Sequence, residues 1–271
     1  MRGSIRNSVV AAAASLVCVA AQSQVTLNAV TGAQGTSTSY SVNGGSLGTG
    51  WVGVNRFSDG SSTFYAYCID PLTVASLPNQ YTTQSLDSFL NGTSTSNYAS
   101  QVARPGYSGL GVSNSASAQS RVLNDLKELF SYAYTDSLTS AVKSAAFGMA
   151  VWEVVLQDGG SASSQFSSAS TSPTARIRSA GSDNLYNNDA LEAQTSAYLT
   201  ALNSNNWGSM TQTNWTYTVY FDGASPISQT FLRVTQKVPE PGSLALAGAA
   251  LLGLLGAQRR RCAMSAGPLQ A

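Results

Sequence analysis

Histidine is absent from this chain of 271 residues, and charged residues make up only 10% of it. The chain therefore lacks the commonest general base and the commonest metal ligand in proteins. We expect no enzyme activity, no cofactor and no metal site. A glycosidase that uses two carboxylates stays formally open, because that chemistry needs no histidine.

Cysteine is also scarce. Of the three cysteines, Cys18 and Cys262 lie near the two ends of the chain, and only Cys68 lies in its central part. An intramolecular disulfide within the central part is therefore excluded. A single cysteine there is most simply a small buried residue of the core, although a lone thiol would be unusual in an oxidising compartment.

The first 23 residues have the pattern of a secretory signal peptide. Arg2 and Arg6 precede an apolar stretch at residues 9–21, and no acidic residue occurs before Asp59. Small residues around position 21 offer a cleavage site for signal peptidase. We therefore predict an N-terminal signal helix that is removed during export.

The other end of the chain carries three features in order. They are the tripeptide Pro239-Glu240-Pro241, an uncharged apolar run at residues 244–257, and the basic cluster of Arg259, Arg260 and Arg261. The run is about fourteen residues long, whereas a spanning helix needs about twenty. Arginines after such a run are retained on the cytoplasmic side. An ordinary membrane anchor is the plainer alternative.

This C-terminal arrangement resembles the PEP-CTERM sorting signal of Gram-negative bacteria, which we place at residues 238–261, with a short tail at 262–271. The resemblance implies an exosortase-type protease that acts near the tripeptide, a transient intermediate held in the inner membrane, and a final location at the cell surface or in the extracellular matrix.

Residues 24–237 remain as one domain, large enough to bury a core. Two of the 14 basic residues fall in the signal peptide and three in the tail, whereas only one of the 13 acidic residues, Glu240, lies outside the domain. The domain therefore carries a net charge near −3, with no basic stripe. Nucleic acid is excluded as a partner on this composition.

The order of strand-like and helix-like segments predicts an α+β fold. Residues rich in Val, Thr, Tyr and Phe, separated by Gly and Asn turns, predict strands at 24–30, 38–42, 51–57, 63–69, 215–221 and 227–234. Helical periodicity predicts helices at 119–134, 137–157 and 189–203. We expect an antiparallel β-sandwich or barrel with an inserted three-helix subdomain at about 117–203.

Two segments inside the domain resemble the paired motifs of thioester domains in bacterial surface proteins. They are Phe64-Tyr-Ala-Tyr-Cys68-Ile-Asp70-Pro, and Ala145-Ala-Phe-Gly148-Met-Ala-Val-Trp152-Glu153. The closing segment from Gln229 to Val234 fits the same family. The resemblance implies that a cysteine thiolate attacks a glutamine side chain, releases ammonia and leaves a thioester that later acylates an amine.

The chain departs from this pattern at the residue that should donate the acyl group. The glutamine is expected one turn before Trp152, and that position is Gly148, which has no side-chain carbonyl. Gln157 lies nine residues further along, which places it on the opposite helix face about 13 Å away along the axis. We therefore expect Cys68 and Gly148 to form a degenerate site, with a free thiol facing the glycine.

Three other groups of residues offer weaker sites. Glu153 is a lone acid on an apolar helix, for which we prefer a structural role. The oxygen-bearing residues between positions 183 and 192 are of a kind that calcium uses, but a helix N-cap at Asn188 or Asp189 explains them more simply. Trp51, Trp207 and Trp215 would suit a sugar-binding platform, but such positions are more often core.

Three functions are compatible with these features of the sequence. The first is an exported, non-enzymatic surface or matrix protein with a structural or adhesive role and no competent thioester. The second is a carbohydrate-binding module with extracellular polysaccharide as its partner. The third is a covalent thioester adhesin that uses a non-standard acyl partner.

Overall fold

The computed structural model describes residues 23–42, 48–107, 112–156, 177–179, 189–222 and 228–237. The predicted signal peptide up to residue 22, Gln157 and the whole C-terminal segment from residue 238 lie outside the described residues. Within the described ranges, no helix combines the length and apolarity that crossing a bilayer requires.

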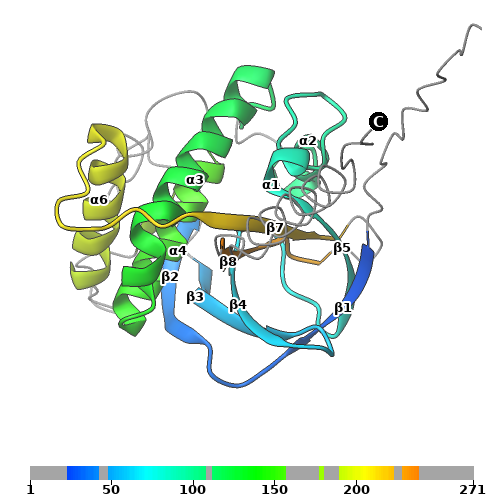
Figure 1. Ribbon diagram of the computed structural model, residues 1–271, viewed down its shortest axis with the longest axis horizontal. Coiled ribbons are helices and arrows are strands. Elements are labelled where there is room, and N and C mark those ends of the chain that lie inside the picture. Colours follow the sequence, from blue (N-terminus) through cyan, green and yellow to red (C-terminus); the bar gives the residue numbers. More distant parts are fainter. Residues whose placement is uncertain are drawn as a thin grey trace, which may run out of the picture.

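The fold is built on a closed antiparallel β-barrel (Figure 1). Its strands are β1 (Ser23–Ala29), β2 (Gln34–Val42), β3 (Gly48–Ser58), β4 (Thr63–Cys68), β5 (Asn79–Ser85), β6 (Ile177–Ser179), β7 (Trp215–Phe221) and β8 (Phe231–Gln236). Their order is β1-β5-β7-β8-β4-β3-β2-β6, and pairing of β1 with β3 closes the ring. β2 and β6 extend the sheet beyond the closure.

The helices follow the strands in two groups. The short helices α1 (Leu86–Phe89) and α2 (Asn97–Val102) come directly after β5 and are followed by a 3-10 turn at Pro105–Tyr107. The long helices are α3 (Ala116–Ser137), α4 (Ala141–Val155) and α6 (Asp189–Ser204). α1 to α4 each begin after a serine whose hydroxyl accepts a backbone N–H of the first turn, which is the usual N-cap: Ser85, Ser96, Ser115 and Ser140.

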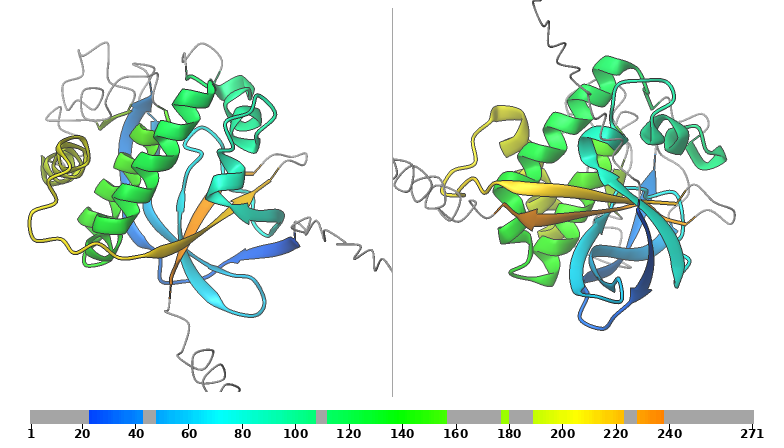
Figure 2. Two further views of the ribbon diagram at one scale, coloured as in Figure 1. Left: turned by 45° about the horizontal axis from the view of Figure 1, so that its top comes forward. Right: turned by 45° about the vertical axis from the view of Figure 1, so that its right-hand side comes forward.

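Helix α4 lies at the centre of the molecule. It packs on β2, β3 and β4 on one side and on α3 and α6 on the other, and Figure 2 shows the three long helices together beside the barrel. Every residue from Ser144 to Val155 is buried. A helix that is apolar around its whole circumference is typical of such a central position.

The ring of Phe147 on α4 joins the helices to the barrel. It lies 4.7 Å from the ring of Tyr67 on β4, and 4.8 Å from the ring of Phe130 on α3 in an edge-to-face arrangement. Aromatic pairs in this geometry add about 0.5–1.5 kcal/mol to the gain from burial.

The predicted α+β fold class is confirmed, and the closed ring makes it a barrel. The strands β5 and β6 and the helices α1 and α2 were not predicted from the sequence. In β5 only Tyr81 is buried, so the strand lacks the alternation that marks a half-buried strand. The predicted helix at 137–157 begins later, at Ala141, because Ser137 ends α3 and Ser140 caps α4.

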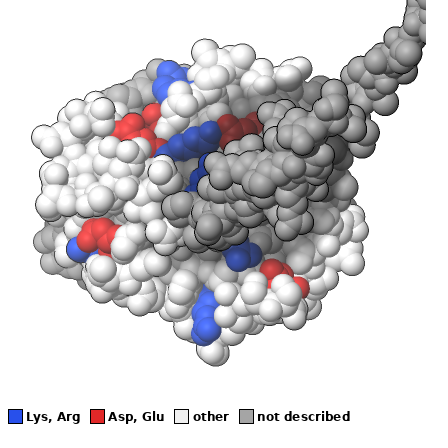
Figure 3. All heavy atoms as spheres, viewed as in Figure 1, with Lys and Arg blue, Asp and Glu red and all other residues white. Residues whose placement is uncertain are grey.

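Few charges appear on the surface. Figure 3 shows a face that is mostly uncharged, with Lys, Arg, Asp and Glu in small separate groups. Two exposed or half-exposed ion pairs join Lys127 to Asp87 and Lys143 to Asp136, each at 2.6 Å. The low charge of the sequence is therefore visible on this face as a small number of charged groups among uncharged residues.

Candidate functional site

Cys68 is the last residue of β4, and its side chain is only 4% exposed. It is a free cysteine, and its sulfur accepts a hydrogen bond from the backbone N–H of Asp70 at 3.2 Å. Burial, and secondly the nearby Asp70 carboxylate, raise the pKa of the Cys68 thiol well above its ordinary value. Because the thiolate is the nucleophilic form, this thiol is a weak nucleophile at neutral pH.

The two segments that were paired from their sequence motifs meet at Cys68. The indole nitrogen of Trp152 on α4 donates to the backbone carbonyl oxygen of Cys68 at 3.1 Å. The ring of Trp152 also lies 5.0 Å from the ring of Tyr40 on β2. Helix α4 is therefore fixed against the end of β4 by the tryptophan.

Gly148, one turn before Trp152, lies against β3. A Cβ built on Gly148 would lie 3.2 Å from the backbone nitrogen of Gly53 and 3.2 Å from Cγ1 of Val52. Gly53 has a φ of +140° and pairs with Gly35 on β2. Three glycines thus allow β2, β3 and α4 to approach closely, and Gly148 has a packing role that its sequence position did not reveal.

The glutamine that lies beside Cys68 is Gln229. Its side chain lines the same cavity as the thiol and lowers the pKa of Cys68, and its Nε2 donates to the backbone oxygen of Asp70 at 3.2 Å. The sequence motifs placed Gln229 in the closing segment but did not connect it to Cys68. No local signal makes that connection, because it arises from the pairing of β4 with β8, in which Cys68 lies opposite Phe231.

A cavity of about 390 Å³ opens beside the thiol. Its wall is formed by β2, β3, the end of β4, the segment that follows β4, and α4. Gly148 is not part of the lining. The lining includes Tyr40, Trp51, Asn55, Cys68, Trp152 and Gln229.

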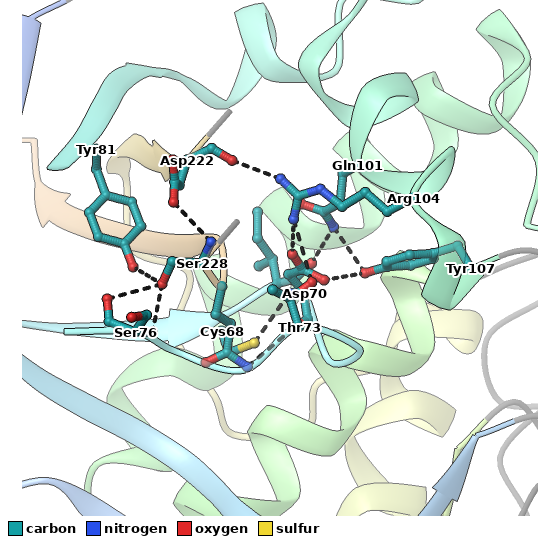
Figure 4. Close-up of polar contacts among 12 residues, drawn as sticks. Cys68, Asp70, Thr73, Ser76, Tyr81, Gln101, Arg104, Tyr107, Asp222 and Ser228 are labelled. Atoms are coloured by element: carbon teal, nitrogen blue, oxygen red, sulfur yellow. Dashed lines mark hydrogen bonds and ion pairs between the residues drawn. The ribbon is translucent and has the colours of Figure 1, made fainter. Parts of the chain in front are cut away.

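The residues that follow Cys68 are held by a buried polar network around Asp70 (Figure 4). The Asp70 carboxylate accepts hydrogen bonds from Tyr107 at 2.7 Å and from Arg104, with which it forms an ion pair. Arg104 also donates to the backbone oxygen of Asp222 at 2.8 Å. Desolvation raises the pKa of Asp70 even though Tyr107 and Arg104 act in the opposite direction. Asp70 thus fixes the position of the segment at residues 71–75, which borders the cavity.

A second junction fixes α4 to the barrel, and it was not predicted from the sequence. The buried hydroxyl of Ser144 donates to the backbone oxygen of Gln34 at 2.9 Å and accepts from the backbone nitrogen of Val54 at 2.9 Å. It also lies 2.9 Å from the hydroxyl of Tyr67. One serine therefore satisfies backbone polar groups of two strands, β2 and β3, at the point where the glycines allow close approach.

The remaining candidate residues do not form a common site. Glu153 is buried on α4, and Glu192 is buried on α6. The residues between 183 and 188 fall outside the described part of the chain. Within the described part, no group of three or more His, Cys, Asp or Glu side chains could hold a metal ion.

The three tryptophans considered as a platform lie in different surroundings. Trp207 is buried and donates to a carboxylate oxygen of Glu128 at 2.9 Å. Trp215 donates to the backbone oxygen of Phe130 at 3.1 Å. Trp51 is 45% exposed and borders the cavity beside Cys68. Of these three residues, Trp51 is therefore the one available to a ligand at that cavity.

The predicted processing residues Pro239, Glu240, Pro241, Arg259, Arg260 and Arg261 all lie outside the described residues. The described fold ends at Lys237, whose backbone N–H donates to the carbonyl oxygen of Asn214 at 3.0 Å. The last strand of the barrel thus leads directly into the C-terminal segment.

Comparison with known families gives a match to the PEP-CTERM protein-sorting motif over residues 237–261. The chain carries a protein-sorting segment. The resemblance found at residues 238–261 is thereby confirmed, and the motif marks the chain as an exported protein that is sorted through the membrane to the cell surface by an exosortase route.

No curated protein matches the chain. Among solved structures, the N-terminal domain of the Streptococcus pyogenes pilus tip adhesin Cpa is similar at 11% sequence identity, with a TM-score of 0.38. The match covers 78% of this chain and 99% of that domain.

Proposed function

We propose that this chain is an exported, non-enzymatic protein of the cell surface or extracellular matrix, with a structural or adhesive role. In this proposal signal peptidase removes the first segment, and an exosortase-type protease acts near Pro239-Glu240-Pro241 while the C-terminal run sits in the inner membrane. The observation that carries the proposal is the sorting motif at residues 237–261, placed directly after the last barrel strand.

The sorting step is tested by following the protein in a Gram-negative host with and without an exosortase-type protease. We expect a shortened, surface-located product only when the protease is present. Replacing Pro239, Glu240 and Pro241 with alanine should leave the longer precursor in the inner membrane, whereas Gln270→Ala serves as the matched control and should be processed normally. Equal processing of the tripeptide variant would refute the proposal.

The adhesive role in this proposal is non-covalent. The buried thiol of Cys68 has a raised pKa, and the position where the thioester family carries its glutamine is occupied by Gly148, packed on β3. Both features support a domain that holds no thioester bond. Intact mass of the exported protein should equal the mass of the unmodified chain between its two processed ends.

A second candidate is favoured by one observation, that Cys68 and Gln229 line the same cavity. In this alternative Sγ would bond to the side-chain carbonyl carbon of Gln229, and the amide nitrogen would leave as ammonia with the thiol proton. A mass deficit of one ammonia, which methylamine converts to the mass of the N-methylamide and which is absent in Gln229→Ala, would establish this function and refute the non-covalent one.

A further inference from the structure

We infer that the cavity beside Cys68 binds one or two residues of a neutral saccharide. The inference deepens the proposed adhesive role and rests on it in one respect, since only an exported protein meets a matrix polysaccharide. The cavity volume of about 390 Å³ falls within the range of about 300–1,000 Å³ that is typical of ligand sites.

Exposed apolar side chains gather at this cavity. Among the described residues, the two large hydrophobic side chains that stand exposed are Trp51, at 45%, and Val74, at 84%. Both line the cavity, although they come from β3 and from the segment after β4. Exposed apolar groups that converge on one hollow mark a binding surface, whereas isolated ones need no explanation.

The residue types that line the cavity indicate which class of ligand it can bind. Tyr40, Trp51 and Trp152 supply aromatic rings, whereas Asn55, Thr73 and Gln229 supply amide and hydroxyl groups. Among the described residues that form the lining, none is Asp, Glu, Lys or Arg. An uncharged site with ring faces and hydrogen-bonding groups fits a ligand that has an apolar face, a hydroxylated edge and no charge. A pyranose ring has these properties.

The side chains that line the cavity are held in position by contacts within the fold, before any ligand binds. On β3 the alternating residues Trp51, Gly53 and Asn55 share one face of the strand, and all three line the cavity. Trp152 is fixed by the carbonyl oxygen of Cys68, and Gln229 by that of Asp70. Groups held in place before binding lose less conformational entropy when a ligand arrives.

The test is titration of the purified exported protein with neutral oligosaccharides of the glucan, mannan, galactan and chitin types, followed by calorimetry and tryptophan fluorescence. We expect at least one neutral oligosaccharide to bind. Trp51→Ala should weaken that binding at least tenfold, and Trp51→Phe should weaken it less because a ring face is kept. Trp215→Phe, at a tryptophan that lines a separate hollow, is the matched control and should bind like the parent protein.

Three results would overturn the inference. They are no binding of any neutral oligosaccharide, unchanged binding by Trp51→Ala, or selective binding of acidic glycans or of peptides. Thermal melts establish that each variant is folded, and Asn55→Ala carries the same test if Trp51→Ala does not fold. Because the assay uses purified protein, absent binding with normal sorting refutes this inference alone, and normal binding with failed sorting refutes the export route alone.

Discussion

The indole N–H of Trp152 donates to the carbonyl oxygen of Cys68 at 3.1 Å, across 84 positions of the chain. This bond fixes helix α4 against the end of strand β4. The Trp152 ring and Cys68, which both line the cavity, are thereby held in a fixed relative position. Substitutions in α4 should therefore change the geometry of the cavity as well as the packing of the core.

Gly148 provides the first prediction. Alanine there would remove a helix penalty of about 1 kcal/mol, but its Cβ would lie 3.2 Å from the backbone of Gly53, and overpacking costs about 1–3 kcal/mol. We expect Gly148→Ala to lower the free energy of unfolding by about 1 kcal/mol and Gly148→Gln by about 3 kcal/mol, without formation of a thioester.

Urea unfolding and intact mass measure these two outcomes. Gly106→Ala is the matched control, because a Cβ at Gly106 meets its nearest neighbour, Cβ of Leu72, at an ordinary 3.4 Å. A Gly148→Gln variant as stable as the parent would show that α4 is not closely packed on β3.

Ser144 provides the second prediction. Ser144→Ala would leave the buried N–H of Val54 and the part-buried carbonyl oxygen of Gln34 without their hydroxyl partner, and an unsatisfied buried group costs about 1–3 kcal/mol. We expect a loss of about 3 kcal/mol in the free energy of unfolding by urea. Ser120→Ala, which removes an exposed hydroxyl of α3, should change stability by no more than about 0.5 kcal/mol. Similar values for the two variants would contradict this role of Ser144.

Arg104 provides the third prediction. Its side chain is 10% exposed and pairs with Asp70, which is fully buried. Removing one partner of a buried pair leaves an uncompensated charge, so Arg104→Met should cost about 3–5 kcal/mol. Lys127→Met, which breaks an exposed pair, should cost no more than about 1 kcal/mol.

The Arg104 variant should also change how stability depends on pH. The pKa of Asp70 is already raised by burial, so the folded state takes up a proton more readily than the unfolded state. Loss of the guanidinium raises this pKa further, so the destabilisation should grow as the pH rises above about 4 and shrink on acidification. Unfolding at pH 4 and pH 8 measures the difference, and an equal cost at both values would refute the explanation.

Asp59 provides the fourth prediction. Its pKa is lowered in the folded state, so its effect on stability depends on pH in the direction opposite to that of Asp70. The hydroxyl of Ser61, together with the backbone N–H groups of Ser61 and Ser62, holds the pKa of Asp59 at about 2, against an ordinary value of 3.8. This turn therefore stabilises the fold fully above pH 4 and loses its effect as the pH falls through about 2.

Acid unfolding of Asp59→Ala checks that assignment. The variant should be less stable than the parent at pH 7, and the gap should close toward pH 2. Asn91→Ala, which removes a neutral side chain from a comparable turn, should keep the same gap at every pH. A constant gap for Asp59→Ala would contradict the prediction.

Local patterns in the sequence predicted most of the barrel and the long helices. Composition rich in Thr, Tyr and Phe predicted β4 and β7, and apolar periodicity predicted α3, because these signals lie within each element. β5 was missed because Tyr81 is its one buried side chain, and the strand is fixed by pairing with β1 and β7. Backbone pairing with neighbouring strands leaves no periodic pattern of apolar residues in the sequence of β5.

The site was predicted less completely than the fold. Sequence motifs brought Cys68 and the helix of Trp152 together, and the structure places them in contact. The neighbours Gln229 and Ser144 come from residues far away in the chain, and their roles depend on strand register. The packing role of Gly148 could not be predicted either. The sequence shows that this position has no side chain, but it does not show that the backbone of Gly53 lies where a side chain would be.

β8 ends at Gln236, and the sorting segment begins at residue 237. Residues 237–243 separate the end of β8 from the apolar run that begins at residue 244. A chain of that length reaches about 24 Å when fully extended. In the proposed membrane-held intermediate the barrel is therefore confined to that distance from the lipid surface, and residues inserted at this junction would extend its reach, whereas insertions elsewhere in the chain would not.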